Sequence, residues 1–373
     1  MKIIIDSDIP FIDNLLEPYF TVLYAKGTEI TNNLIKDADA LIIRTRTKCN
    51  SSLLEGTSVK FIATATIGTD HIDLEYCKNR GIRVANAAGC NAGGVMQYVF
   101  TALYSLALKK GFKLPDFSPG RNQENLKGVI GVIGDGNVGS RVAAMAEYLG
   151  FEVLRCDPVK EREQTLNFNA GKLRLSEFKD YYSLDYLLEN SDIVTMHTWL
   201  DDITRGMANE EFFNKMKSGA VFINASRGEV VNEAALLGSI YKLGAVVIDV
   251  WNGEPNISLE LLNAADIATP HIAGYSFEGK VNGTEMSVRA VGDFFGIEPL
   301  KTFETSKNGY EPKIVDFAGL NYKEISEKLT GIFPIFEDDF NLRQNLQSFE
   351  ILRSNYNYRR EFYVNPTTKT TDC

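Results

Sequence analysis

Three residues that could together bind a carboxylate and move a proton follow successive predicted strands late in the chain. Arg227 lies in "NASRGEVV", Glu254 in "IDVWNGEP" and His271 in "TPHIAGY". An arginine presents a planar fork of donors that matches a carboxylate. A histidine can accept a hydroxyl proton near neutral pH, and a neighbouring glutamate favours its charged form. These residue types predict chemistry in which a hydroxyl loses its proton while a hydride leaves the same carbon.

Each of these residues also has an ordinary structural explanation. Arg227 could cap a helix or form a surface ion pair, Glu254 could be a solvated loop acid, and His271 could be a core residue. Ligands of open α/β sheets bind beyond the carboxyl ends of the strands, so three such residues at successive strand ends favour one shared site. We expect His71, in "GTDHIDL", to help begin a helix and His197, in "MHTW", to line a cofactor cleft. With three histidines in the sequence, no Cys/His cluster has metal-ligand spacing, and we predict no metal.

A glycine-rich loop, "GDGNVG", lies between a predicted strand and a helical pattern and is typical of a dinucleotide site. The first glycine of such a loop permits a tight turn, the second lets the backbone approach a pyrophosphate, and the third lets the helix pack closely. Asp157 ends the next predicted strand, 18 residues after the loop, where an acid binds the ribose hydroxyls. The pattern predicts NAD rather than NADP, although Arg155 weakens that preference slightly. The predicted contacts in the loop are Gly134, Gly136, Asn137, Val138 and Gly139.

The elements that must position these residues form two alternating series. Apolar runs at 2–6, 40–45, 59–65 and 82–86 are typical of strands. An apolar helix is expected at 92–108, followed by a loop rich in Gly, Pro and Asn at 111–128. Six further strands are expected at 128–134, 151–157, 192–198, 220–226, 245–250 and 266–271, with helices at 138–149, 183–190, 208–217 and 232–243. This alternation predicts two doubly wound parallel sheets, and beyond about residue 291 a small α+β region.

Composition and charge exclude several classes of protein. The net charge of −10 argues against non-specific nucleic-acid binding, which needs a cationic surface. Five cysteines without a CxxC pair indicate free thiols in a reducing cytoplasm. The N-terminal "MKIIIDSDIP" is typical of a strand and not of a signal peptide. The run at 92–108 is shorter than the roughly 20 apolar residues of a membrane span. We therefore expect a cytoplasmic protein with neither nucleic-acid nor membrane partners.

A cluster of cations in "RTRTK" indicates an anionic substrate. Arg44, Arg46 and Lys48 recur at every second residue and would share one face if the strand continued through them. Such a face would give an acidic protein a concentrated anion site, whereas the alternative is a solvated strand end. Three arginines of the C-terminal region could add to that site, from the same or a partner subunit, or hold a dimer together: Arg353, Arg359 and Arg360.

The motifs "GDGNVG" with Asp157, "NASRGEVV", "DVWNGEP" and "TPHIAG" resemble those of the D-isomer-specific 2-hydroxyacid dehydrogenases over about residues 1–290. The resemblance implies catalytic roles for Arg227, Glu254 and His271. It also implies an α/β fold in which a Rossmann-type NAD domain (99–271) is inserted in a flavodoxin-like substrate domain (1–98 with 272–290).

A closer resemblance, to one branch of that family, rests on "ADALIIRTRTKCN", "KFIATATIGTDHID", "GCNAGGVMQYVF", "HIAGYSFEGK" and "LRSNYNYRRE". It implies a phosphorylated substrate and a homodimer formed through an α+β C-terminal domain, here 291–373. It also implies substrate contacts by Thr45, Thr66 and Tyr275. The further NAD contacts that it implies are Thr198, Asp249 and Gly274.

The chain departs from the pattern of that branch at two positions. Thr45 stands where serine is usual, and Ser226 stands where cysteine is common. Both changes are conservative, so they leave the resemblance standing, but they make the exact phosphate contacts less certain than the reaction class. The alternatives are another D-2-hydroxyacid dehydrogenase, such as a phosphoglycerate dehydrogenase, and an NAD-sensing protein without catalysis.

Overall fold

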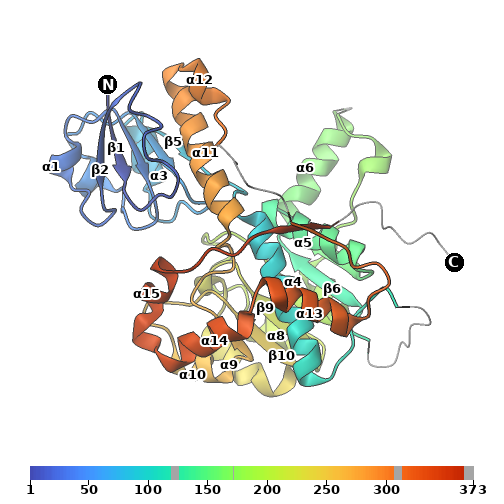
Figure 1. The fold of residues 1–373 in the computed structure, drawn as a ribbon. Helices are drawn as coiled ribbons and strands as arrows, with labels where there is room; N and C mark the ends of the chain where they lie inside the picture. The colour runs from blue at the N-terminus through green and yellow to red at the C-terminus, as the bar shows by residue number, and fades with distance from the viewer. Residues whose placement is uncertain (119–125, 171, 306–312, 365–373) are drawn as a thin grey trace. The chain divides into compact units, whose positions relative to one another are not determined.

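The computed structural model describes residues 1–118, 126–170, 172–305 and 313–364, which form two compact units (Figure 1). Unit 1 comprises Met1–Asn91 and Ser276–Glu311, and unit 2 comprises Ala92–Tyr275 and Pro312–Cys373. This division differs from the three domains expected from the sequence. The boundaries fall after residues 91 and 275 rather than 98 and 271, and the described residues from 313 onward make their contacts within unit 2.

Unit 1 contains a five-stranded parallel sheet in the order β2-β1-β3-β4-β5, which is the flavodoxin-like order. Successive side chains of a strand point to opposite faces, so Ile3 and Ile5 enter one core and Ile4 enters another. The strands are β1 (Lys2–Asp6), β2 (Thr21–Ala25), β3 (Ala40–Ile43), β4 (Phe61–Thr64) and β5 (Arg83–Asn86).

Helices cover both faces of this sheet, as a parallel sheet requires. Ile35, Leu54 and Cys77 bring three short helices onto the face of Ile4. Val288 and Val291 bring a long helix onto the opposite face. The helices are α1 (Asn32–Ile35), α2 (Ser51–Leu54), α3 (Leu74–Asn79), α11 (Phe277–Phe295) and α12 (Glu298–Lys301).

Unit 2 is built on a six-stranded parallel sheet in the order β11-β10-β9-β8-β6-β7. An isolated bridge between Arg155 of β7 and Tyr181 extends it by one position. With that bridge included, the chain order across the sheet matches the classic Rossmann order, with a topological switch between β6 and β8. The strands are β6 (Val129–Ile133), β7 (Glu152–Cys156), β8 (Ile193–Met196), β9 (Val221–Asn224), β10 (Ala245–Ile248) and β11 (Ile267–Ala268).

The long helix α4 (Ala92–Lys110) is buried over most of its length and shares a core with α5 (Asn137–Tyr148) and one face of this sheet. The opposite face forms a second core. The other helices between strands are α6 (Pro158–Asn169), α7 (Leu184–Asn190), α8 (Glu210–Lys215), α9 (Glu233–Ser239) and α10 (Leu259–Ala264). Short 3₁₀ turns of unit 2 occur, in the residues described, at Leu175–Glu177, Gly228–Val230, Ile240–Lys242 and Leu346–Ser348.

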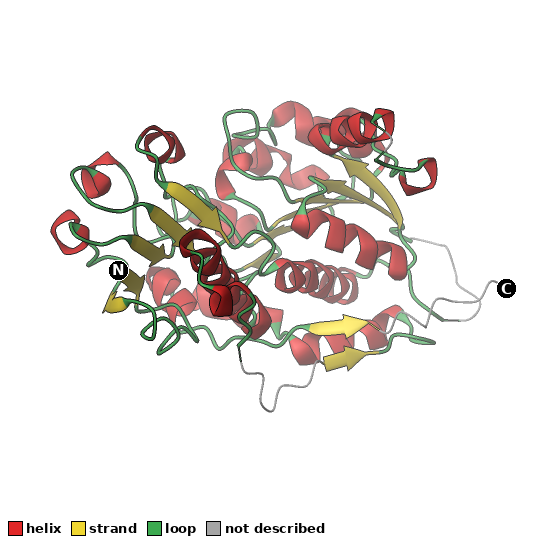
Figure 2. Cartoon of the chain, turned by 90° about the horizontal axis from the view of Figure 1, so that it is seen from above, coloured by secondary structure: helices red, strands yellow, loops and turns green. Residues whose placement is uncertain are grey.

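The C-terminal stretch of unit 2 joins the same core. Phe317 and Leu329 pack into the cluster that contains α4 and α5. β12 (Lys313–Val315) and β13 (Phe362–Val364) form a small parallel sheet apart from the six-stranded one (Figure 2). Between them lie α13 (Tyr322–Ile332), α14 (Ile335–Gln344) and α15 (Phe349–Ser354).

Every strand predicted from the sequence is present, most of them with shorter ends. The elements that were missed include β2, α6 and α10. β2 is a partly exposed edge strand, and α10 is a single short helix. α6 buries no residue and has no apolar stripe, so periodicity cannot reveal it. Its visible signal was the Asp157-Pro158 start, because an acid at the N-cap followed by proline favours a helix N-terminus.

Candidate active site

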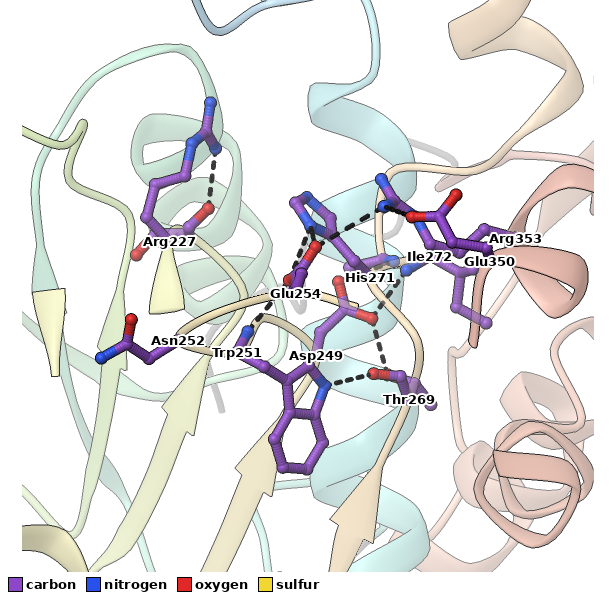
Figure 3. Close-up of polar contacts among 12 residues, drawn as sticks. Arg227, Asp249, Trp251, Asn252, Glu254, Thr269, His271, Ile272, Glu350 and Arg353 are labelled. Carbon is purple, nitrogen blue, oxygen red and sulfur yellow. Dashed lines mark hydrogen bonds and ion pairs between the residues drawn. The ribbon is translucent and has the colours of Figure 1, made fainter. Parts of the chain in front are cut away.

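His271 and Glu254 form a direct pair at the carboxyl end of the sheet in unit 2 (Figure 3). His271 Nδ1 lies 2.9 Å from Oε2 and 3.0 Å from Oε1 of the Glu254 carboxylate. The two side chains are 31% and 18% exposed, so the ring remains accessible while the carboxylate is mostly covered. A carboxylate on one ring nitrogen fixes the tautomer and the ring orientation, and leaves Nε2 to exchange a proton with a ligand.

Several groups act on the Glu254 carboxyl. Burial on its own raises the pKa of this group, but the His271 ring, Arg353 and the Trp251 N–H outweigh it and hold the pKa below its usual value. The Trp251 N–H donates to Oε1 at 3.0 Å. The carboxylate is therefore ionised at neutral pH and can stabilise a protonated His271 ring.

Asp249, which follows β10, holds the backbone of the His271 loop. Its carboxylate accepts the N–H groups of Ile272 at 2.8 Å and Ala273 at 3.0 Å, and its carbonyl accepts the His271 N–H at 2.7 Å. The Thr269 hydroxyl donates to the same carboxylate at 2.6 Å. These bonds keep His271 in a left-handed conformation, with φ 57, that a non-glycine residue rarely adopts. The resemblance implies an NAD contact for Asp249, which stays a prediction, and the bonds described show that Asp249 also positions the loop.

Arg227 lies in the turn after β9. Asn224 shapes this turn by donating its side-chain amide to the Arg227 carbonyl at 2.9 Å. Arg227 Nη1 donates to the Ser226 carbonyl at 2.7 Å, and its side chain is partly exposed. Gly228 follows because a Cβ there would collide with the backbone of Trp251. Figure 3 shows Arg227 and the His271 ring extending from the same edge of the sheet.

The glycine loop between β6 and α5 fits a dinucleotide. Gly134 has φ 90, and a Cβ there would lie 2.8 Å from the His197 carbonyl oxygen, so glycine is required. A Cβ on Gly139 would overlap the Gly134 carbonyl, whereas Gly136 faces open space. α5 begins after Gly136 without a side-chain cap. Its first N–H groups, Asn137 and Val138 among them, therefore suit an anion such as a pyrophosphate.

Two further residues of the predicted NAD site border this loop. Asp157 accepts the Asp135 N–H at 2.9 Å and caps α6 by accepting the N–H groups of Val159 and Lys160. The Thr198 hydroxyl is buried and has no hydrogen-bond partner within the described ranges, so it is available to a ligand. Asp157 holds the glycine loop in place, and the Thr198 hydroxyl beside it lacks a partner among the described residues. Both features are consistent with a cofactor site at this loop.

His197 and Arg155 support this site from the protein side. His197 bonds to the Thr195 hydroxyl at 3.0 Å, and burial lowers its pKa to about 3, so its ring is neutral at physiological pH. Arg155 pairs with Glu147 at 2.5 Å and lies 3.9 Å from Asp135. Because these acids already contact Arg155, this residue is less available to a 2′-phosphate and weakens the predicted preference for NAD less than the sequence suggests.

In unit 1, the cations of "RTRTK" do not share a face, which corrects the sequence prediction. β3 ends at Ile43, and a turn follows in which the Thr47 N–H donates to the Arg44 carbonyl at 3.2 Å. Arg44 pairs with Asp6 at 3.3 Å and Asp8 at 2.8 Å. The strand ends here because its pairing with β1 stops at Ile42 and β4 ends at Thr64, opposite Ile43.

The two other cations line a pocket of about 500 Å³ within unit 1. Arg46 and Lys48 share it with polar residues that include Thr28, Asn32 and Ser52. Thr45 lies exposed in the turn beside them. The pocket places two of the three predicted cations next to hydroxyl groups, which suits an anion.

Thr66 belongs to a polar chain at the end of β4. Its hydroxyl lies 2.7 Å from that of Thr64, which in turn lies 3.3 Å from His71 Nε2. The expectation that His71 begins a helix was wrong, because Asp73 caps α3 by accepting the Tyr76 N–H. No role was predicted for Thr64, although its position at a strand end was a usable signal.

The C-terminal stretch contacts the loop after His271. Gly274 and Tyr275 are partly exposed, and the Tyr275 ring packs edge-on against Tyr356 and Tyr358 with centroids 6.0 and 6.3 Å apart. Arg353 pairs with Glu254, Arg359 is buried against backbone carbonyls, and Arg360 is partly exposed. The structure thus brings Arg353 and Arg359 to the His271 loop within one chain.

Within the described ranges, no group of three His, Cys, Asp or Glu side chains is arranged to hold a metal ion. The helices in these ranges include none with the length and apolar character needed to cross a membrane.

Comparison with known proteins defines the class of this fold and site. Residues 110–273 match the family model "D-isomer specific 2-hydroxyacid dehydrogenase, NAD binding domain". The structure resembles a D-lactate dehydrogenase from Aquifex aeolicus complexed with NAD and lactic acid, at a TM-score of 0.62 and 27% identity over 79% of this chain and 96% of that one. It also resembles an NAD-bound 3-phosphoglycerate dehydrogenase from Entamoeba histolytica, at a TM-score of 0.63 and 25% identity over 81% and 97%. The fold is that of the NAD-dependent D-2-hydroxyacid dehydrogenases.

Full-length relatives narrow this class. The chain is 42% identical to an erythronate-4-phosphate dehydrogenase of Bacteroides fragilis over 97% of both chains. It is 37% identical to one of Acinetobacter baumannii over 97% of this chain and 98% of that one. The chain belongs to the erythronate-4-phosphate dehydrogenase family.

Proposed function

We propose that this protein oxidises 4-phospho-D-erythronate to 2-oxo-3-hydroxy-4-phosphobutanoate with NAD, in the biosynthesis of pyridoxal 5′-phosphate. The Glu254–His271 pair in the same unit as the dinucleotide loop is the observation that carries the reaction class. The choice of substrate is supported by the names of relatives that match over nearly the whole chain.

Three side chains of unit 2 have a catalytic task in this proposal, and a further set is proposed to hold the cofactor. Arg227 binds the substrate carboxylate through its fork of donors and orients the carbon that carries the hydroxyl. Nε2 of His271 accepts the hydroxyl proton, while Glu254 holds Nδ1 and stabilises the charged ring. NAD, when bound, supplies the acceptor for the hydride. The residues proposed to hold it are Gly134, Gly136, Asn137, Val138, Gly139, Asp157, Thr198, Asp249 and Gly274.

The substrate contacts in the proposal are drawn from the sequence prediction. Arg46 and Lys48, which line the polar pocket of unit 1, are the strongest candidates for a phosphate. Arg44 is a weaker candidate, because Asp6 and Asp8 already neutralise it. The remaining proposed contacts are Thr45, Thr66 and Tyr275.

The assembly and cellular location are also proposals. We propose a homodimer formed through residues 291–373, which would act in the cytoplasm. The support for a dimer is the resemblance of this C-terminal region to a dimerisation domain. Sedimentation of the full chain would test the assembly, with the mass of two chains expected and the mass of one chain contradicting the proposal.

The function is tested by NADH formation with 4-phospho-D-erythronate, beside 3-phospho-D-glycerate and D-lactate. A parallel assay contains a 2-oxo acid acceptor and follows the reduction of that acceptor, which reports oxidation of the substrate even where free NADH does not accumulate. Turnover with phosphoerythronate alone is expected. Preference for another hydroxy acid would support the proposed reaction class but contradict 4-phospho-D-erythronate as the substrate. Tight NAD binding without any oxidation would favour a sensing protein.

A further inference from the structure

The C-terminal stretch of unit 2 fastens the loop that carries His271. Arg359 is buried and donates from Nη1 to the carbonyls of Ile272 and Tyr275, both at 3.0 Å, and from Nη2 to that of Gly94 at 3.0 Å. Its guanidinium lies 4.1 Å from the centre of the Phe333 ring. These bonds fix the backbone on the C-terminal side of His271, while Asp249 fixes it from the strand side. A residue six positions before Arg359 reaches the His271–Glu254 pair itself.

Arg353, on α15, lies against the carboxylate that orients His271. Its Nη1 is 3.5 Å from Oε2 of Glu254, the same oxygen that lies 2.9 Å from His271 Nδ1 (Figure 3). The guanidinium stacks on Phe349 at 5.8 Å, pairs with Glu350 at 3.7 Å and hydrogen-bonds the Tyr275 side chain. The Arg353 side chain is 18% exposed, so water screens the pair with Glu254 only in part.

We propose that Arg353 is a positioning residue for proton transfer, which fixes the Glu254 carboxylate beside His271 and offsets part of its charge. Without Arg353 the carboxylate would be held only by the ring and by the Trp251 N–H on Oε1, whereas a second cation on Oε2 restrains the other oxygen as well. The same cation limits how strongly Glu254 stabilises the charged ring, so His271 can release its proton as well as accept it. The proposal deepens the proposed function and rests on it for the reaction that is assayed.

The charged groups around the pair give the sign of the effect. Arg353 and Glu350 approach it from α15 and Asp249 from the end of β10, while the neutral but titratable Tyr275 approaches from the loop after His271. Loss of Arg353 therefore removes a cation and leaves acids, so the protonated state of the Glu254–His271 pair gains stability. The acidic limb of the pH profile for oxidation moves to higher pH, because the ring must be neutral to accept a proton. An ion pair at this range corresponds to a shift of about one pH unit.

The test compares Arg353→Gln and Arg353→Lys with a matched control, Arg343→Gln. Arg343 is also a partly covered arginine of the C-terminal stretch, since it pairs with Asp339 at 2.8 Å and donates to the carbonyls of Leu262 and Ala265. It lies on α14 and touches neither Glu254 nor His271 in the bonds described. For Arg353→Gln we expect kcat to fall about tenfold with little change in KM, and the acidic limb to move upward. Arg353→Lys should restore the limb and part of kcat, while Arg343→Gln should keep both and lose only thermal stability.

A second readout does not depend on turnover. Histidine ring NMR signals can be followed against pH in the full chain, which has only three histidines. His197 does not interfere, since burial lowers its pKa to about 3. The signal that disappears in a His271→Asn variant should titrate at higher pH in Arg353→Gln than in the unaltered protein, and return in Arg353→Lys.

Three results would overturn the proposal. An unchanged limb and an unchanged ring titration in folded Arg353→Gln would show that the ion pair has no electrostatic effect. A rise in KM alone would assign Arg353 to substrate binding. Equal losses of kcat in Arg353→Gln and Arg343→Gln would assign it to stability. If the unaltered protein oxidises no hydroxy acid, the proposed function fails, but the ring titration still decides whether Arg353 acts on the pair.

Discussion

His271 Nδ1 lies 2.9 Å from Oε2 of Glu254, so the other ring nitrogen, Nε2, is the atom left to exchange a proton with substrate. Asp249 supports this arrangement by accepting the backbone N–H groups of His271, Ile272 and Ala273. The ring thus has a fixed orientation before any ligand binds, which is the condition for efficient general acid–base catalysis.

Replacing His271 with asparagine should remove the proton acceptor and leave the cofactor loop intact. We expect kcat to fall by about 10²–10⁴, the usual contribution of a positioned acid or base. Fluorescence titration should show NAD binding within a few-fold of that of the unaltered protein. Activity that survives this change would mean that another group, or water, accepts the proton.

Replacing Glu254 with glutamine should act in the direction opposite to the loss of Arg353. The pKa of the Glu254 carboxyl is lowered, so this group is ionised across the neutral range and stabilises the protonated ring. Its removal destabilises the protonated ring, and the acidic limb of the oxidation profile should move to lower pH by about one unit or more. Reduction of the 2-oxo acid, which needs the protonated ring, should lose its activity at neutral pH. Steady-state rates in both directions over a range of pH would measure this, and a limb that stays in place would contradict the pairing.

Replacing Arg227 with lysine tests whether the planar fork matters or only the charge. Lysine keeps the cation but cannot bind a carboxylate through two parallel donors. We expect kcat/KM to fall by about 10²–10³, similar to the loss of one charge-stabilising donor in other enzymes. Arg205→Lys offers a control, because Arg205 lies in the same unit and borders a separate pocket with Glu229 and Asn232. Equal losses of kcat/KM at the two positions would contradict the proposal that Arg227 binds the substrate carboxylate.

Much of this site could be predicted from the sequence because each key residue follows an apolar strand of a parallel sheet. Strand order then brings Asp249 and His271 to one edge without any need to know the loops. The direction of Arg44 could not be predicted in the same way, since this residue pairs with Asp6 and Asp8, nearly forty residues earlier. The contact made by Arg353 was also beyond the sequence, which offered this residue for the anion site or for a dimer, whereas only the packing of α15 places it on Glu254.

Asp157 combines a structural and a binding role, which two substitutions can separate. It caps α6 and holds the Asp135 N–H, so Asp157→Ala should lower stability by about 1 kcal/mol, the usual cost of a lost N-cap. Asp157→Asn keeps an oxygen for the cap and should retain most of that stability. Both variants should bind NAD less tightly and NADP relatively better, because the charge that repels a 2′-phosphate is gone. Thermal melts and KM values for the two cofactors would check this, and unchanged cofactor preference in Asp157→Asn would limit Asp157 to its structural role.

Gly228 tests whether the turn that presents Arg227 depends on close backbone packing. A Cβ at this position would collide with the carbonyl group of Trp251, so Gly228→Ala must move either the Arg227 turn or the segment that leads to Glu254. We expect a loss of about 1–3 kcal/mol in the free energy of unfolding, as for other overpacked sites, with a marked fall in kcat/KM. Gly238→Ala is the matched control, because Gly238 lies in α9 and a Cβ added there would have no atom within 4 Å. Alanine there should stabilise the protein by up to about 1 kcal/mol through helix propensity and leave kcat/KM unchanged. Denaturant titrations and initial rates of the two variants give both quantities, and a neutral Gly228→Ala would show that the turn can relax without displacing the site.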